Sequence, residues 1–190
     1  MTEYELIAGL KQGHEQAFEE LVDLYKNKVY NTCLGFVQNE EDGEELTQDV
    51  FIKVFENIGS FKGESKLSTW LYRIAVTQSL DFIRRKNRKK RSGFLLSISS
   101  KPENEWQQPD FFHPGVAAEQ KENAAVLFKA IRQLPEQQQT AFLLQKLEGL
   151  NQQEVADVMR TTVSAVESLL QRAKANLRKN LETYYKNITK

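Results

Sequence analysis

Apolar side chains recur at spacings of three and four residues along most of this chain. Two long segments, 18–36 and 46–58, have this spacing and are separated by a polar break at 39–43. A third segment begins near Ser65 or Ser68, either of which is a plausible N-cap. No stretch alternates with period two for long enough to predict a strand. The chain is therefore expected to be all-α.

The first three helices are expected to pack into one unit with their apolar faces inward. The third helix then continues beyond its apolar positions into a run of basic residues. The predicted inward positions are Phe18, Leu21, Val22, Tyr25, Val29, Cys33 and Phe36 in the first helix, Leu46, Val50, Phe51, Val54, Phe55 and Ile58 in the second, and Trp70, Leu71, Ile74 and Phe82 in the third.

The helical periodicity is lost between about residues 92 and 114. This stretch holds three of the four prolines and is rich in Ser and Gln, which is typical of a linker. We therefore expect two small helical domains, 1–91 and 117–190, joined by a flexible linker at 92–116. The linker also carries aromatic side chains that we expect to dock on a flanking domain, namely Trp106, Phe111 and Phe112.

The second domain begins with two further helical segments. Pro135 separates them and is suited to the first position of the second one, because that position needs no amide donor. Gly149 then marks the C-terminal end of this helix. The predicted inward positions are Val126, Leu127, Ala130, Ile131, Leu134, Ala141, Phe142, Leu144 and Leu147.

Two more helices near the C-terminus have the layout of a helix-turn-helix. Asn151 followed by Glu154 is close to a capping box, and Thr162 can cap the second helix. Two helices that cross steeply need a small residue at the contact, here Ala156, and an apolar anchor ten residues later, here Val166. In such a motif the second helix enters the major groove of DNA.

Arg160 departs from the usual pattern of this motif, since glycine is common where the turn needs a left-handed backbone. The spacing alone would also fit a packing hairpin with no DNA contact. If the motif binds DNA, the outward face of the second helix comprises Ser164, Ala165, Glu167, Ser168 and Gln171, with Arg172 and Lys174 toward phosphates.

Charge is strongly segregated, although the chain holds 26 Lys and Arg against 26 Asp and Glu. Residues 1–60 hold 4 basic against 13 acidic side chains, whereas 61–95 hold 10 basic against 2 acidic. The run Arg84–Arg91 reads RRKNRKKR, and seven of its eight residues are cations. Such a run also suits a solvated tail or a localisation signal. Because it ends an aromatic-rich amphipathic segment and precedes the helix-turn-helix, we favour nucleic acid as its partner.

Several classes of function lack support in the sequence. With a single cysteine, Cys33, the chain cannot form an intramolecular disulfide framework. One cysteine and two histidines also do not suit a Cys/His zinc site, so we expect no metal or cofactor. The acidic N-terminus does not resemble a signal peptide, and no apolar run approaches membrane-spanning length, so we expect a cytoplasmic protein without membrane insertion. The chain has no glycine-rich phosphate loop or nucleophile elbow, and we expect no enzymatic activity.

Three blocks of the sequence together resemble the sigma factors of bacterial RNA polymerase, in the extracytoplasmic-function (ECF) group. Glu15–Asn31 and Glu44–Phe55, which contains LTQDVF, resemble the first part of region 2 of that family. Phe61–Lys90, which contains STWLYRIA, resembles the part that melts promoters and reads the −10 element, and Leu134–Lys179 resembles region 4. The resemblance covers most of the chain in the right order.

The resemblance implies two sets of partner-binding residues in the first domain. An acidic helix would dock on the β′ clamp helices of core RNA polymerase, and the following loop and helix would bind the −10 element. The polymerase-binding positions are Asp42, Glu45, Leu46, Gln48, Asp49 and Phe51. The −10 positions are Phe61, Lys66, Ser68, Arg73, Thr77, Arg84, Arg85 and Arg88.

The resemblance also implies that region 4 contacts the β flap of polymerase and reads the −35 element. The −35 positions are Thr162, Ser164, Ala165, Glu167, Ser168, Gln171, Arg172 and Lys174. Relatives often have Asn in place of Thr77 and cations in place of Glu167 and Leu169, so base preference is expected to differ at these positions. Members of the group are commonly held inactive by an anti-sigma factor, often bound to the membrane, which adds an expected partner.

Two alternatives remain open at this point. A stand-alone regulator that binds duplex DNA through the helix-turn-helix would explain the last 60 or so residues, but it would leave the acidic helix and the basic run without a role. The linker, whose acidic residues are Glu103, Glu105 and Asp110, suits either a plain tether or a segment that follows the cationic RNA path of polymerase.

Overall fold

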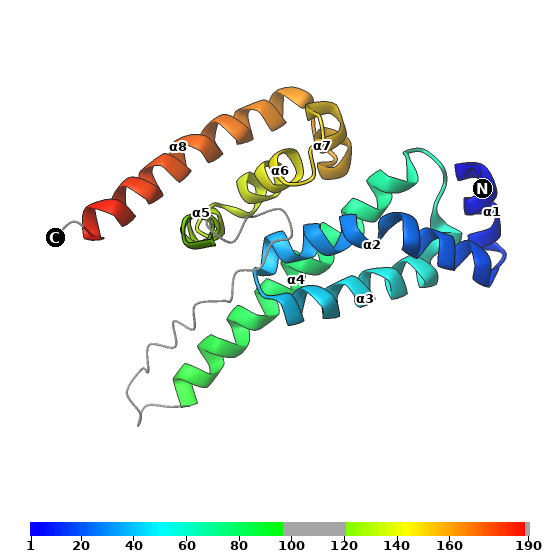
Figure 1. Ribbon diagram of the computed structural model, residues 1–190, viewed down its shortest axis with the longest axis horizontal. Helices are drawn as coiled ribbons and strands as arrows, with labels where there is room; N and C mark the ends of the chain where they lie inside the picture. Colours follow the sequence, from blue (N-terminus) through cyan, green and yellow to red (C-terminus); the bar gives the residue numbers. More distant parts are fainter. Residues whose placement is uncertain (97–120, 189–190) are drawn as a thin grey trace.

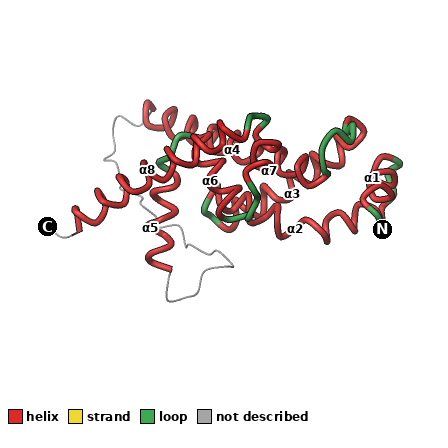
Figure 2. The backbone as a smooth tube through the Cα atoms, turned by 90° about the horizontal axis from the view of Figure 1, so that it is seen from above, coloured by secondary structure: helices red, strands yellow, loops and turns green. Residues whose placement is uncertain are grey.

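The computed structural model describes residues 1–96 and 121–188, and every regular element in these ranges is helical (Figures 1 and 2). The prediction of an all-α protein is confirmed. The expected linker aromatics, Trp106, Phe111 and Phe112, lie outside the described residues. The elements are α1 (Glu3–Lys11), α2 (Glu15–Val37), α3 (Glu40–Asn57), the 3-10 helix η1 (Ile58–Ser60), α4 (Leu67–Leu96), α5 (Lys121–Arg132), α6 (Glu136–Lys146), α7 (Gln152–Met159) and α8 (Val163–Ile188).

The N-terminal half, α1 to α4, forms one core in which α2, α3 and α4 pack against one another. Leu21, Leu46 and Leu67 are fully buried there. Helix α2 ends at Val37, and its C-cap Gln38 has a left-handed backbone with φ 54°. Asn39 then caps α3 by accepting a hydrogen bond of 2.8 Å from the amide of Asp42. The break between the two helices is therefore shorter than the sequence suggested.

Two of the expected features of this half are wrong. Phe55 was predicted to point inward, but it is 56% exposed and packs edge-on against Phe18. Neither Ser65 nor Ser68 caps α4. The first helical amide, that of Leu67, instead donates a hydrogen bond of 3.0 Å to the carboxylate of Glu3 on α1. A cap supplied from 64 residues away leaves no local sequence signal.

The C-terminal half, α5 to α8, follows the sequence prediction closely, except that Leu127 of α5, predicted to point inward, is exposed. Asn151 and Glu154 form the expected capping box at the start of α7, with hydrogen bonds of 3.0 and 3.1 Å. Thr162 accepts a bond of 3.2 Å from the amide of Ala165 and so caps α8. Arg160 has the left-handed backbone that the turn requires, with φ 51°. Pro135 is the N-cap of α6 and not its first residue, one position earlier than expected.

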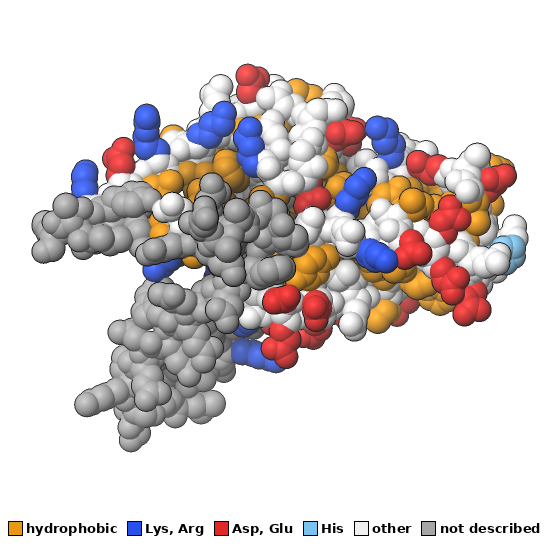
Figure 3. Space-filling view, viewed as in Figure 1, with side chains coloured by type: hydrophobic (Ala, Val, Ile, Leu, Met, Phe, Trp, Pro, Cys, Tyr) orange, Lys and Arg blue, Asp and Glu red, His pale blue; other side chains and the backbone are white. Residues whose placement is uncertain are grey.

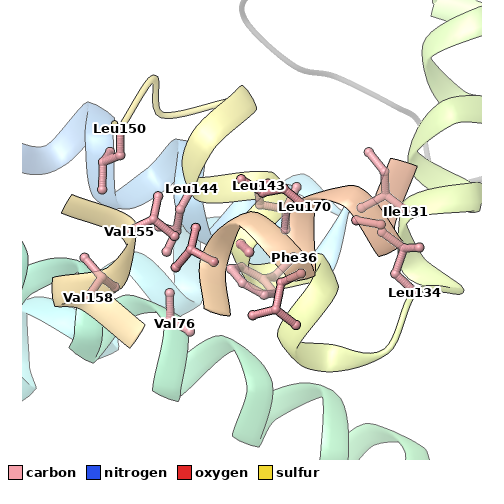
Figure 4. Packing of buried hydrophobic residues seen from close by; sticks show 14 of the residues in the cluster. Phe36, Val76, Ile131, Leu134, Leu143, Leu144, Leu150, Val155, Val158 and Leu170 are labelled. Carbon is pink, nitrogen blue, oxygen red and sulfur yellow. The ribbon is translucent and has the colours of Figure 1, made fainter. Parts of the chain in front are cut away.

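The two halves are packed together and share a second hydrophobic core. Phe36 of α2 and Tyr72 and Val76 of α4 are buried among residues of the C-terminal half. In Figure 4, Phe36 and Val76 reach into a cluster formed by side chains such as Leu144 and Val155. Helix α4 therefore buries two faces, one in each core, which a search for a single apolar stripe does not detect.

Candidate nucleic-acid and polymerase interfaces

The exposed face of α3 carries acidic, polar and apolar side chains together. Glu45 and Gln48 are exposed and Asp49 is half-buried, between one and three helical turns from the N-terminus of the helix. Asp42, at the start of α3, forms an ion pair of 2.6 Å with Lys86 of α4. Of the predicted acids, Glu45 and Asp49 therefore remain available to a basic partner on one side of the helix, near the exposed Glu41 and Glu44.

Leu46 and Phe51, which the resemblance placed among the polymerase contacts, lie in the core at 0% and 7% exposure. In this structure they hold α3 in place, and no partner can reach them. The same helix exposes Ile52 and Phe55 by 53% and 56%. These two side chains follow Gln48 and Asp49 on the same side, and their exposure makes them candidate contact residues that sequence reasoning missed.

Two of the arginines expected to contact DNA on α4 are bound to the C-terminal half. The guanidinium of Arg84 donates hydrogen bonds of 3.1 and 2.6 Å to the two carboxylate oxygens of Glu136, the first residue of α6. These bonds raise the pKa of Arg84 and lower that of Glu136. Arg73 donates two hydrogen bonds to the backbone carbonyl of Asp157 on α7, and burial lowers its pKa.

The remaining −10 positions divide into buried and exposed groups. Phe61 is 4% exposed and packs on Trp70 with ring centroids 5.3 Å apart, so it supports the loop from within. Ser68 is half-buried, and the Thr77 hydroxyl donates to the carbonyl of Arg73. Lys66 is exposed and pairs with Glu154 at 3.4 Å, whereas Arg85 and Arg88 project into solvent along α4.

A cavity of about 670 Å³ lies between α4 and the C-terminal half. Its wall combines residues expected to read the −10 element with residues of α6 and α7. From α4 it includes Trp70, Arg73, Thr77 and Arg84, and from the C-terminal half Glu136 and Arg160. Three of the eight predicted −10 residues, Arg73, Thr77 and Arg84, thus line one cavity, and the C-terminal half forms its opposite wall.

The face of α8 expected to read the −35 element is exposed to solvent. Thr162, Ser164, Glu167, Ser168 and Gln171 are exposed, as are Arg172 and Lys174, and Ala165 is half-buried. Val166, Leu170 and Ala173 point inward and are buried. In Figure 3 basic side chains are spread over α8, whereas acidic side chains gather at the end of the molecule formed by α1, α2 and α3.

An apolar groove of about 660 Å³ runs along the second half of α8, where it faces α5. Leu127 of α5, which is 38% exposed, lines it together with Leu177 and Leu181. Lys174, Arg178, Lys186 and Glu182 border it.

Among the residues that the structure describes, no group of three or more His, Cys, Asp or Glu side chains could hold a metal ion. Within the same ranges, no helix is both long and apolar enough to cross a membrane.

Comparison with known proteins shows which family the chain belongs to. The model of sigma-70 region 2 matches residues 21–89, and that of sigma-70 region 4 matches residues 125–177. The RNA polymerase sigma-H factor of Pseudomonas aeruginosa is 31% identical over 179 residues, which cover 94% of this chain and 93% of the relative. The chain belongs to the sigma-70 family.

Other relatives place this sigma factor in the ECF group. The ECF RNA polymerase sigma factor SigW of Bacillus subtilis is 31% identical over 179 residues, covering 92% of this chain and 94% of the relative. Among solved structures, the sigma factor RpoE of Bartonella quintana, in complex with the anti-sigma factor NepR, has a TM-score of 0.61 at 19% identity. That match covers 87% of this chain and 96% of the other and supports the same fold.

Proposed function

We propose that this sigma factor binds core RNA polymerase through α3 and recognises promoters through α4 and α8. Directing promoter-specific transcription by RNA polymerase is the function that membership of the family carries. The separation of charge best supports this assignment of polymerase binding to α3 and promoter recognition to α4 and α8. Exposed acids lie on α3, and exposed arginines and lysines lie on α4 and α8. We propose no catalytic activity and a cytoplasmic site of action.

The surface for the β′ clamp helices comprises Glu45, Gln48 and Asp49 together with Ile52 and Phe55. Carboxylates attract the basic partner, and the two apolar side chains lose their exposed surface on binding. The groove beside α8, with Leu127, Leu177 and Leu181 at its base, is the proposed contact for the β flap. Its apolar floor, and a border of three cations with the single acid Glu182, suit an amphipathic segment with acidic edges.

Promoter recognition is divided between the two halves. Arg73, Arg84, Arg85 and Arg88 are proposed to bind phosphates of the melted −10 element, where cations follow the backbone and bases enter shaped pockets. Glu167 and Gln171 are proposed to read −35 base edges in the major groove, and Glu167 would favour a cytosine amino group as its donor. Arg172 and Lys174 would contact the flanking phosphates.

An anti-sigma factor is a further proposed partner, since a structurally similar sigma factor is bound to one.

A single experiment distinguishes a polymerase-dependent promoter-specificity factor from a stand-alone regulator. Promoter-specific DNA binding is measured with and without core polymerase, using the same promoter fragments. A sigma factor requires the polymerase for specific binding and strand opening, whereas a stand-alone regulator binds the same site with equal affinity alone.

A further inference from the structure

The cavity between α4 and the C-terminal half carries an excess of positive charge. The charged residues of its wall are Lys53, Arg73, Arg84, Arg160 and the single acid Glu136. Both carboxylate oxygens of Glu136 are bound by the guanidinium of Arg84, and Lys53 forms an ion pair of 2.6 Å within α3. Among the described residues, Arg73 and Arg160 are therefore the cations of this wall that form no ion pair.

Arg73 and Arg160 approach each other from the two halves of the molecule. The guanidinium of Arg73, on α4, donates two hydrogen bonds to the carbonyl of Asp157, one turn before Arg160 at the end of α7. Burial lowers the pKa of Arg73, the charge of Arg160 lowers it further, and Asp157 opposes them only in part. Two like charges held close together favour an anion between them.

The turn that Arg160 occupies does not explain the choice of arginine. Its backbone is left-handed, with φ 51° and ψ 50°, a conformation that glycine adopts more readily. Its side chain is exposed, and no hydrogen bond or ion pair joins that side chain to another residue that the structure describes. The feature that arginine adds at this position is thus a guanidinium on the wall of the cavity.

The rest of the cavity suits the organic part of a small ligand. Its volume of about 670 Å³ lies within the range of about 300 to 1,000 Å³ that is typical of small-molecule sites. Trp70, one turn before Arg73 on α4, is half-buried and lines the same wall, which offers a stacking surface to a flat ring. The apolar wall is completed by Ile74, Leu80, Val158 and Met159.

We propose that this cavity binds a small phosphorylated ligand of the size and chemistry of a nucleoside diphosphate, with its phosphates between Arg73 and Arg160 and its ring against Trp70. Guanidinium groups bind phosphate oxygens through paired hydrogen bonds. Two neighbouring cations match one diphosphate, whereas a DNA strand is followed by cations spaced along its path. The proposal goes beyond promoter recognition and does not depend on it.

The test is isothermal titration calorimetry of the full chain with ADP, inorganic pyrophosphate and a single-stranded oligonucleotide of mixed sequence. Arg160→Gly is the decisive variant, because glycine keeps the left-handed turn while the charge is removed. Arg160→Lys keeps the charge. The matched control is Arg132→Ala, since Arg132 is exposed at the end of α5 and is not part of the cavity wall. Circular dichroism and thermal melting check that each variant is folded.

ADP is expected to bind the wild type and Arg132→Ala equally, and to bind Arg160→Gly about tenfold more weakly. Arg160→Lys should fall between them, because an ammonium keeps the charge but not the paired hydrogen bonds. Pyrophosphate should bind more weakly than ADP, since it has no ring. Trp106→Phe leaves Trp70 as the one tryptophan of the chain, and ADP should change its fluorescence with the same dissociation constant that calorimetry gives.

Three results would overturn the proposal. They are ADP affinity that is unchanged in the folded Arg160→Gly variant, no measurable ADP binding by the wild type, and pyrophosphate binding as tight as that of ADP. An oligonucleotide that binds more tightly than ADP and loses affinity in Arg160→Gly would assign the cavity to nucleic acid and also overturn it. None of these results bears on the proposed function, because Arg160 is not among the residues proposed to bind polymerase or promoter DNA.

Discussion

The hydroxyl of Tyr72 on α4 donates a hydrogen bond of 3.2 Å to the carboxylate of Glu148, which follows α6 in the other half of the molecule. The second carboxylate oxygen of Glu148 is buried and has no hydrogen-bond partner among the described residues. Burial raises the pKa of Glu148 to about 7, against the opposing effects of Tyr72, Thr32 and Lys28. A carboxyl group thus titrates near neutral pH at the boundary between the halves.

The first prediction is that the packing of the two halves against each other weakens as the pH rises. The pKa of Glu148 is about 7 when the halves are packed together, compared with 4.5 for an ordinary glutamate, so the packed state binds the proton more tightly. Its stabilisation is complete below pH 4.5 and is lost as the pH rises through about 7. The radius of gyration should therefore be larger at about pH 8 than at about pH 6.

Glu148→Gln provides the control for this prediction, since the amide keeps the shape of the side chain and does not titrate. The other titratable or charged groups that face the site are Lys28 and Cys33 on α2, Tyr72 on α4 and Glu154 on α7. Burial raises the pKa of Cys33 to about 11, above the range tested, and raises that of Tyr72 as well. An unchanged pH dependence in Glu148→Gln would show that another group is responsible.

The second prediction concerns polymerase binding. Glu45→Lys combined with Asp49→Lys should weaken the affinity for core polymerase, because it reverses both charges on the exposed face of α3. The matched control is Glu15→Lys with Glu19→Lys, which changes the same charge at the same spacing on exposed positions of α2. A pull-down at moderate salt measures the affinity. If both double variants bind as tightly as the wild type, α3 is not the polymerase surface.

A third prediction addresses promoter opening. Replacing Arg84, Arg85 and Arg88 by Ala should reduce open-complex formation and flatten its dependence on salt. Each lost phosphate contact lowers the log–log slope by roughly 0.7 to 0.9, so three contacts give a change that is readily measured. Lys26, which is exposed on α2 and forms an ion pair with Asp23 in the same helix, offers a control substitution to Ala. A wild-type salt slope in the triple variant would exclude these arginines as phosphate ligands.

The fourth prediction separates base reading from packing in α8. Glu167→Ala and Gln171→Ala should change the −35 sequences selected from a randomised promoter library, with the −10 preference and thermal stability nearly unchanged, because both side chains are exposed. Val166→Asp should instead unfold the C-terminal half, since Val166 is fully buried and an unpaired charge there costs more than about 3 kcal/mol. Wild-type −35 selectivity in the Glu167 and Gln171 variants would place the reading face elsewhere.

The sequence predicted the features that local chemistry determines. The caps at Asn151 and Thr162 and the left-handed turn at Arg160 depend on residues within three positions of one another, and all three are present. The helix α1 was missed although Thr2 and Glu5 form a capping box, a signal of the same kind.

Features set by distant parts of the chain could not be predicted. The cap that Glu3 provides for α4 and the contact between Tyr72 and Glu148 join residues far apart in the sequence. Helical periodicity also could not show that Phe51 is buried while Phe55 is exposed, because both occur in the apolar pattern of α3. Only the packing of α3 against α2 and α4 distinguishes them.

Promoter specificity is tested most directly by sequencing the 5′ ends of transcripts made by core polymerase with this protein on a library of genomic DNA fragments. A sigma factor gives start sites that share aligned −10 and −35 elements and that disappear when the protein is left out. Start sites without a common element, or sites unchanged by omitting the protein, would contradict its assignment as a promoter-specificity factor.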